Sequence, residues 1–126
     1  MTTLPRPTQA ELDLLRVLWR TGPATVKQVH HEVLKERDVA YAAVLRLMQV
    51  MHTKGILLRD EGQRAHVYRP AHKQVALQKR LLRDLIQKAF SGSGRDLVLA
   101  ALRGGHVTPE ERREIQTFLD TTEGTR

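Results

Sequence analysis

The side chains with the most specific chemistry fall between residues 40 and 54, where they recur at helical spacing. The positions i, i+4, i+7 and i+11 of this segment are Ala42, Arg46, Gln49 and Thr53. On a helix these positions share one face. Arginine can donate two hydrogen bonds to guanine, glutamine can pair with adenine, and small residues such as Ala42 and Ala43 allow close approach to a base edge. The face is predicted to read bases in DNA; a solvated helix surface is the alternative.

A second set of residues has the chemistry of phosphate contacts, which position a protein on DNA without selecting a sequence. These hydroxyl-bearing and basic residues are Thr25, Lys27, Tyr41, Lys54 and Arg64. Arg59, His66 and Arg69 are weaker candidates, because the side chains of a strand alternate in direction. The alternative for these three is surface charge that protects two edge strands from pairing with other chains.

Charge supports a polyanionic partner for the front of the chain. The 126 residues include 21 Lys and Arg against 14 Asp and Glu, a net charge of +7. Residues 1–71 hold eleven basic and seven acidic side chains (net +4), residues 72–103 seven and two (net +5), and residues 104–126 three and five (net −2). Such a balance suits nucleic acid, although ordinary basic proteins share it. We therefore expect DNA against the front of the chain and not against its tail.

The elements that must hold these residues can be predicted from caps, breaks and periodicity. Capping-box patterns at Thr8 and Thr25 open two helices, and the helix over 40–54 ends at Gly55 in the left-handed position. Two short apolar runs, 56–59 and 66–69, form a hairpin. Three short helices followed by a hairpin outline a winged helix-turn-helix. The predicted fold is mostly α with one small β-hairpin.

The remaining residues are predicted to form a helical dimerisation region, residues 72–126, behind a DNA-binding domain of residues 1–71. Helices are expected from about residue 72 to 90, over 97–102, and from Thr108 to about 119. Their apolar face is wide for so small a segment, so a partner subunit should bury part of it. Its residues are Leu77, Leu81, Leu82, Leu85, Ile86, Phe90, Leu97, Leu102, Ile115, Phe118 and Leu119. An intramolecular three-helix core is the alternative.

Several function classes are disfavoured. The chain has no cysteine, which removes disulfides, thiolate metal sites and cysteine nucleophiles. A zinc-protease pattern starting at His31 would need a second histidine where Lys35 stands. We expect no cofactor, no metal and no enzymatic activity. No apolar run is long enough to insert into a membrane, and residues 1–7 do not resemble a signal peptide. The expected location is the cytoplasm.

Three segments carry a family resemblance. Residues 40–57, AYAAVLRLMQVMHTKGIL, resemble the recognition helix of the BlaI/MecI family of penicillinase repressors. Residues 8–19 resemble that family's first helix and residues 62–70 its wing, and the likeness extends through the helical tail. The resemblance implies a homodimeric repressor of a palindromic DNA operator. It implies control of β-lactam-resistance or copper-handling genes, and in the β-lactam systems a membrane sensor-protease as partner.

This chain departs from the family pattern at three places. The family often has threonine at the positions of Ala42, Ala43 and Arg46, and arginine at that of Val50. The operator is therefore expected to differ from the usual one. Ala100-Ala101 stand where family cleavage is associated with an Asn-Phe pair, which puts cleavage-driven release in question. The absence of cysteine excludes copper sensing through thiolates.

Two other functions compete with the repressor. The first is a winged-helix module that binds proteins and never touches DNA. The second is a repressor that senses a small molecule between its two parts, which the scarcity of aromatic residues disfavours. The salt dependence of DNA binding distinguishes the protein-binding module from a repressor, because DNA affinity that depends on phosphate contacts falls steeply as the salt concentration rises.

Overall fold

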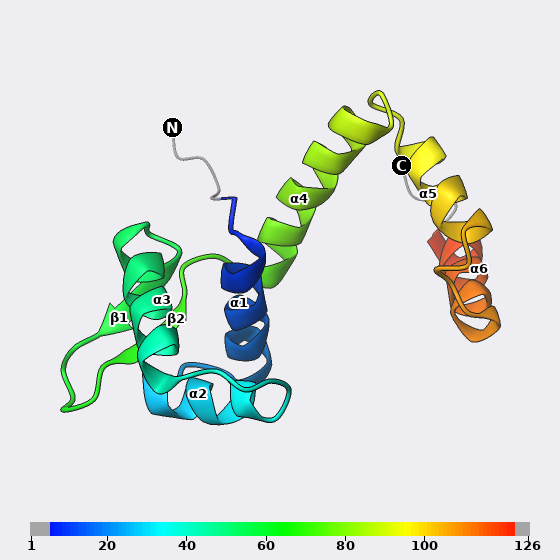
Figure 1. Cartoon of the computed structure of the whole chain (residues 1–126). Helices are drawn as coiled ribbons and strands as arrows, with labels where there is room; N and C mark the ends of the chain where they lie inside the picture. The colour runs from blue at the N-terminus through cyan, green and yellow to red at the C-terminus, as the bar shows by residue number, and fades with distance from the viewer. Residues whose placement is uncertain (1–5, 123–126) are drawn as a thin grey trace. The chain divides into compact units, whose positions relative to one another are not determined.

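The computed structural model describes residues 6–122, and the expectations about residues 1–5 and 123–126 lie outside it. Its elements are α1 (Gln9–Thr21), α2 (Val26–Leu34), α3 (Tyr41–Thr53), β1 (Leu57–Asp60), β2 (Val67–Pro70), α4 (Gln74–Ala89), α5 (Gly94–Arg103) and α6 (Pro109–Thr122) (Figure 1). The predicted order of three helices, a hairpin and three helices is confirmed. The described residues form two compact units, which divide between Leu81 and Leu82. The expected functional division at 71/72 stays a prediction.

The first two helices begin at the predicted capping boxes. The Thr8 hydroxyl accepts a hydrogen bond from the Glu11 amide at 3.2 Å, and the Glu11 carboxylate accepts one from the Thr8 amide at 2.9 Å. Thr25 and Gln28 repeat this exchange at the start of α2. A cap of this kind stabilises a helix by about 1 kcal/mol. The local sequence thus sets where α1 and α2 start.

Helix α3 has a weak start and a well-defined end. Its N-cap, Ala40, has no side chain that can accept a hydrogen bond from the first turn. At the other end Gly55 takes φ +83°, and the Ile56 amide donates to the Met51 carbonyl at 2.9 Å. This confirms the predicted left-handed glycine, which lets the chain turn sharply from α3 into the hairpin.

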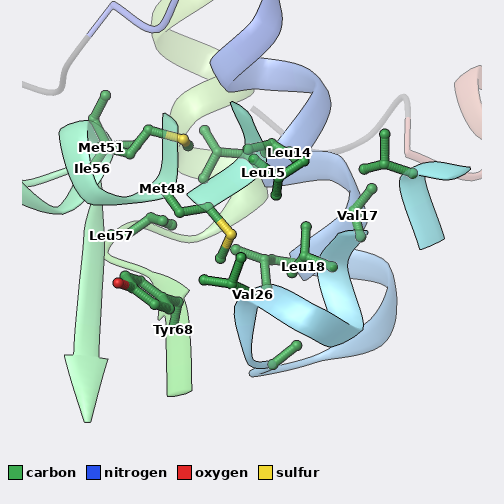
Figure 2. Packing of buried hydrophobic residues seen from close by; sticks show 14 of the residues in the cluster. Leu14, Leu15, Val17, Leu18, Val26, Met48, Met51, Ile56, Leu57 and Tyr68 are labelled. Carbon is green, nitrogen blue, oxygen red and sulfur yellow. The ribbon is translucent and has the colours of Figure 1, made fainter. Parts of the chain in front are cut away.

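The core of the first unit is built from one apolar stripe of each helix and the inner face of the hairpin (Figure 2). Its fully buried members include Leu14, Leu15, Leu18, Val29, Met48, Met51, Leu57 and Tyr68. Burial of each large apolar side chain contributes about 1.5–3 kcal/mol. Because α3 gives Val44, Met48 and Met51 to this core, its opposite face must point to solvent.

The hairpin pairs one residue later than predicted, with Leu57 opposite Pro70 and Asp60 opposite Val67. The shift has a physical cause: the amide of Ile56 already closes the end of α3. The backbone of Ala24, before α2, adds a bridge to β2, exchanging hydrogen bonds of 3.0 and 2.8 Å with Tyr68. This bridge holds the start of α2 beside the hairpin.

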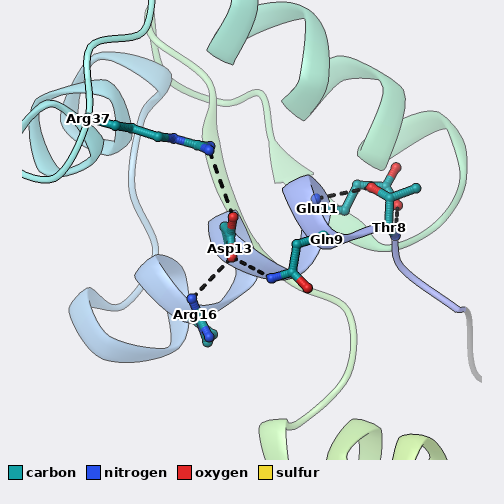
Figure 3. Close-up of polar contacts among 6 residues, drawn as sticks. All are labelled: Thr8, Gln9, Glu11, Asp13, Arg16 and Arg37. Atoms are coloured by element: carbon teal, nitrogen blue, oxygen red, sulfur yellow. Dashed lines mark hydrogen bonds and ion pairs between the residues drawn. The ribbon is translucent and has the colours of Figure 1, made fainter.

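A polar network joins α1 to the turn before α3 (Figure 3). The Asp13 carboxylate accepts hydrogen bonds from Gln9 at 2.9 Å and from Arg16 at 3.1 Å. Arg37, from the segment between α2 and α3, lies 3.9 Å from the same carboxylate. Exposed contacts of this type contribute little each, but they join α1 to the segment before α3 around one carboxylate.

Helix α4 begins in the first unit, where two residues of the predicted dimer face contact the core. Leu77 is buried in the core of the first unit, and Leu81 packs against that core. Leu77 is covered within one chain and Leu81 only in part, and the dimer role predicted for both residues stays a prediction. The sequence suggested one face because Leu77, Leu81 and Leu85 follow each other at i, i+4 spacing, although Leu85 is exposed.

The second unit contains the end of α4 and the two last helices. Helix α5 starts at Gly94, earlier than the predicted 97, because the Ser93 hydroxyl caps it by accepting from the Asp96 amide at 3.0 Å. Thr108 and Glu111 form the predicted start of α6, with hydrogen bonds of 2.9 and 3.0 Å. The Arg112 guanidinium donates to the carbonyl of Leu102, which ties α6 to the end of α5.

Candidate nucleic-acid interface

The predicted base-reading residues lie together on the solvent face of α3. Ala42, Arg46, Gln49 and Thr53 are all exposed, opposite the buried stripe of the helix. The Thr53 hydroxyl donates to the carbonyl of Gln49 at 3.1 Å, within the helix. A helix with its side chains is about 10–12 Å across, and the major groove of B-DNA is about 12 Å wide. The face has the dimensions and the donors for base contact.

A groove of about 380 Å³ lies beside α3, between the start of α2 and the hairpin. It brings together residues that are far apart in the sequence and that were predicted to bind DNA: Thr25, Lys27, Tyr41, Gln49 and Arg64. Val26, Leu45 and Tyr68 supply apolar lining. The backbone bridge between Ala24 and Tyr68 explains the assembly, because it fixes the cap of α2 next to β2.

Three cations of this surface are not engaged by other side chains. Within residues 6–122, no hydrogen bond or ion pair holds the side chains of Lys27, Arg46 or Arg64, and all three are exposed. A solvated cation without an internal partner can meet a phosphate or a base without first breaking a contact. These side chains form the electropositive part of the candidate interface.

Arg59, by contrast, is occupied within the hairpin. Its Nε donates to Glu61 at 2.6 Å, and Nη1 lies 3.5 Å from the Tyr68 hydroxyl. The hydrogen bonds with Tyr68 and Glu61 raise the pKa of Arg59, while the hydrogen bond from Arg59 lowers that of Glu61. Arg59 therefore stabilises the hairpin from within, and its weaker candidacy as a DNA contact stays a prediction.

His30 contacts a residue of the groove, and sequence reasoning did not find this role. Its Nε2 lies 2.7 Å from the Val39 carbonyl, which can only accept, so that nitrogen donates. The His30 ring also meets the Tyr41 ring edge-on, with centroids 5.7 Å apart. His30 thus connects α2 with the start of α3 and limits the positions that Tyr41 can take. Only the fold brings these residues together, so no spacing rule could have found them.

Lys54 has an internal partner. Its ammonium donates to Glu11 at 2.7 Å, and Glu11 is buried in the first unit. Burial by itself would raise the pKa of Glu11, but hydrogen bonds from Lys54 and Thr8 outweigh it and lower that pKa. The predicted phosphate contact therefore coincides with a structural ion pair between α1 and the end of α3.

Ala43 lies on the other flank of α3. It lines a separate groove with Ala10 and Leu14 of α1, Val33 of α2, and Leu47. The structure thus separates Ala43 from Ala42, which shares the exposed face with Arg46. Adjacent residues on a helix point about 100° apart, so the pair could not both face the same base edge directly.

The predicted dimer residues of the second unit are largely accessible. Leu82, Leu85, Phe118 and Leu119 are between 46% and 63% exposed, and Ile86, Phe90, Leu97, Leu102 and Ile115 are half-buried. Between residues 6 and 122, no group of three His, Asp or Glu side chains could hold a metal ion. No helix in that range is long and apolar enough to cross a membrane.

Comparison with known proteins places the chain. The model of the penicillinase repressor family matches residues 7–121. The chain belongs to this family. The transcriptional regulator BlaI of Mycobacterium tuberculosis is 34% identical over 100 residues, which are 79% of this chain and 72% of that protein. The penicillinase repressor of Bacillus licheniformis is 21% identical over 120 residues, 95% of this chain and 94% of that one.

A solved structure agrees with the fold of this member of the penicillinase repressor family. The solution structure of monomeric Bacillus licheniformis BlaI in complex with the blaP half-operator matches with a TM-score of 0.51 and 23% identity. The match covers 59% of this chain and 90% of that one. The fold is confirmed as winged-helix, and the family is one of transcriptional repressors and not of enzymes.

Proposed function

We propose that this protein is a homodimeric repressor that binds a palindromic operator, with α3 in the major groove of each half-site and the 56–70 hairpin as a wing. The observation that carries the proposal is the groove beside α3, because it gathers Lys27, Tyr41 and Arg64 next to the exposed face of Arg46 and Gln49. Phosphate contacts and base contacts are then supplied by neighbouring surfaces, as a DNA-reading helix requires.

Each residue of the proposed interface has a role that follows from its chemistry. Arg46 and Gln49 pair with guanine and adenine edges, and Ala42 leaves room for a base or a thymine methyl. The phosphate contacts are Thr25, Lys27, Tyr41 and Arg64, with Thr53 at the end of the face. Lys54 and Ala43 are left out of this set, since Lys54 pairs with Glu11 and Ala43 lines a different groove.

The dimer is proposed from the second unit. Leu82, Leu85 and Leu119 are each about half exposed, and a partner subunit would remove them from water. The homologous Bacillus licheniformis BlaI was studied with a half-operator, which supports an operator of two halves. Two-fold proteins and two-fold operators match, because each subunit then makes the same contacts to its own half-site.

The regulated genes are proposed from family membership: β-lactam-resistance or related genes, repressed by occupancy of the promoter in the cytoplasm. A membrane sensor-protease is the corresponding partner. Ala100 and Ala101 lie inside helix α5, where the family's Asn-Phe pair is replaced. We therefore expect the repressor to leave its operator in response to another signal, or after cleavage of another peptide bond.

Salt dependence tests the function against the protein-binding alternative. A duplex selected by the protein from a random library is titrated at several salt concentrations. A repressor that meets several phosphates per subunit loses affinity with a slope of about −0.9 per phosphate in log–log form. The same titration with Lys35→Ala is the control, because Lys35 pairs with Glu32 away from the groove. If no duplex binds at low salt, the protein is not a DNA-binding repressor.

A further inference from the structure

His66, which the sequence offers only as a weaker candidate for phosphate contact, is a titratable residue of this groove. His66 is exposed in the loop between β1 and β2, and it lines the groove together with Lys27, Tyr41 and Arg64. Histidine changes its charge between about pH 5 and pH 8, so a groove that binds phosphate gains a further cation when the imidazole takes up a proton. Position and chemistry together make His66 a candidate for contact with the DNA backbone.

Charged side chains of both signs lie near His66. Lys27 on α2 and Arg64 on the same loop are positive and line the same groove. Glu61 is negative: the hydrogen bond from Arg59 contributes most to lowering the pKa of Glu61, and the nearby charges of His66 and His52 act in the same direction.

Two further side chains with polar ends, Tyr41 on α3 and Tyr68 on β2, line the same groove. A bound phosphodiester would add negative charge beside the cations. Binding of DNA should therefore favour the protonated form of His66.

We propose that protonated His66 is a further phosphate contact of this groove, so that affinity for duplex DNA rises as the pH falls through the histidine range. The inference rests on the proposed function, since it adds a contact to the same interface. A group that gains a proton on binding makes affinity increase toward lower pH, by the same linkage that couples protonation to folding. A phosphate contact does not select sequence, so the effect should appear on any duplex.

The test is a titration of a short mixed-sequence duplex with the full chain at constant ionic strength, from about pH 8 to about pH 5.5. The wild-type protein should gain affinity by on the order of threefold per subunit, the strength of an exposed ion pair. The slope of affinity against salt should also be steeper at low pH, by up to about 0.9 per subunit.

Two variants of His66 and one control decide the outcome. His66→Gln should lose this gain, and His66→Arg should bind at pH 8 as tightly as the wild type does at low pH. His106→Gln, in the exposed turn before α6, should keep the wild-type profile. If His66→Gln has the same pH profile as the wild type, the inference is wrong while the repressor function stands. If the wild type binds no duplex at any pH, the function itself fails.

Discussion

The ammonium of Lys54 lies 2.7 Å from a carboxylate oxygen of Glu11, and it joins the end of α3 to the first turn of α1. The other oxygen of Glu11 accepts from the Thr8 amide at 2.9 Å. One buried carboxylate therefore closes the start of α1 and holds the end of the proposed recognition helix.

Replacing Lys54 should cost stability. In Lys54→Met the buried Glu11 loses its charged partner, and we expect the free energy of unfolding to fall by about 1–3 kcal/mol. Urea denaturation followed by circular dichroism measures the change. Lys35→Met is the control, since it breaks an exposed pair with Glu32 and should change stability by no more than about 0.5 kcal/mol. If both variants lost the same free energy of unfolding, the Lys54–Glu11 pair would contribute no more to stability than an exposed ion pair.

Acid should release this pair in a predictable direction. The folded protein holds the pKa of Glu11 below its ordinary value of 4.5, although burial acts in the opposite sense. Its contribution is therefore complete above about pH 4.5 and is lost as the pH falls through the lower, folded value. Glu11→Gln should be less stable than the wild type near neutral pH, and the difference should shrink in acid. If the stability difference between the wild type and Glu11→Gln grew in acid, the pKa of Glu11 would not be lowered in the folded protein.

Replacing Arg46 and replacing Lys27 should change DNA binding in different ways. Arg46→Ala should change the ranking of operator variants, because it removes a base contact worth about 1–3 kcal/mol. Lys27→Ala should weaken all duplexes alike and reduce the salt slope by about 0.9 per subunit. Competition binding with a panel of single-base variants measures both. An unchanged ranking in Arg46→Ala would remove this residue from the base-reading set.

The two ends of α4 should respond differently to mutation. Leu85→Glu places a charge on the exposed half of the helix, and it should give a folded monomer with much weaker binding to the whole operator. Sedimentation equilibrium measures the mass. If the variant sedimented as an intact dimer, Leu85 would lie outside the interface.

Leu77 should instead matter for folding. The side chain is 1% exposed in the first unit, and its removal in Leu77→Ala should destabilise that unit by about 2–5 kcal/mol. Thermal denaturation at several protein concentrations checks this, because a folding defect does not disappear at high concentration. A variant with wild-type stability would contradict the placement of Leu77 in the core.

Local rules predicted much of this fold. The capping boxes at Thr8, Thr25 and Thr108 and the left-handed Gly55 depend on neighbours within a few residues, and the structure confirms each. The hairpin was predicted one residue early. A pattern of apolar residues does not reveal that the Ile56 amide donates its hydrogen bond to the end of α3.

Contacts between distant segments could not be predicted in this way. Glu11 and Lys54 are 43 positions apart, and their pairing depends on how α1 crosses α3. Leu77 and Leu85 share a helical spacing but have different environments, since only one of them reaches the core. The contact of His30 with Tyr41 arises from the turn between α2 and α3, which no local sequence pattern describes.

Methylation interference tests the central claim that α3 reads the major groove. Guanine N7 faces that groove, so a selected duplex methylated there should bind the wild-type protein more weakly, at equivalent positions in both half-sites. In Arg46→Ala, at least one guanine per half-site should no longer be sensitive to methylation. If N7-methylated duplexes bound the wild type as tightly as unmodified ones, α3 would not lie in the major groove.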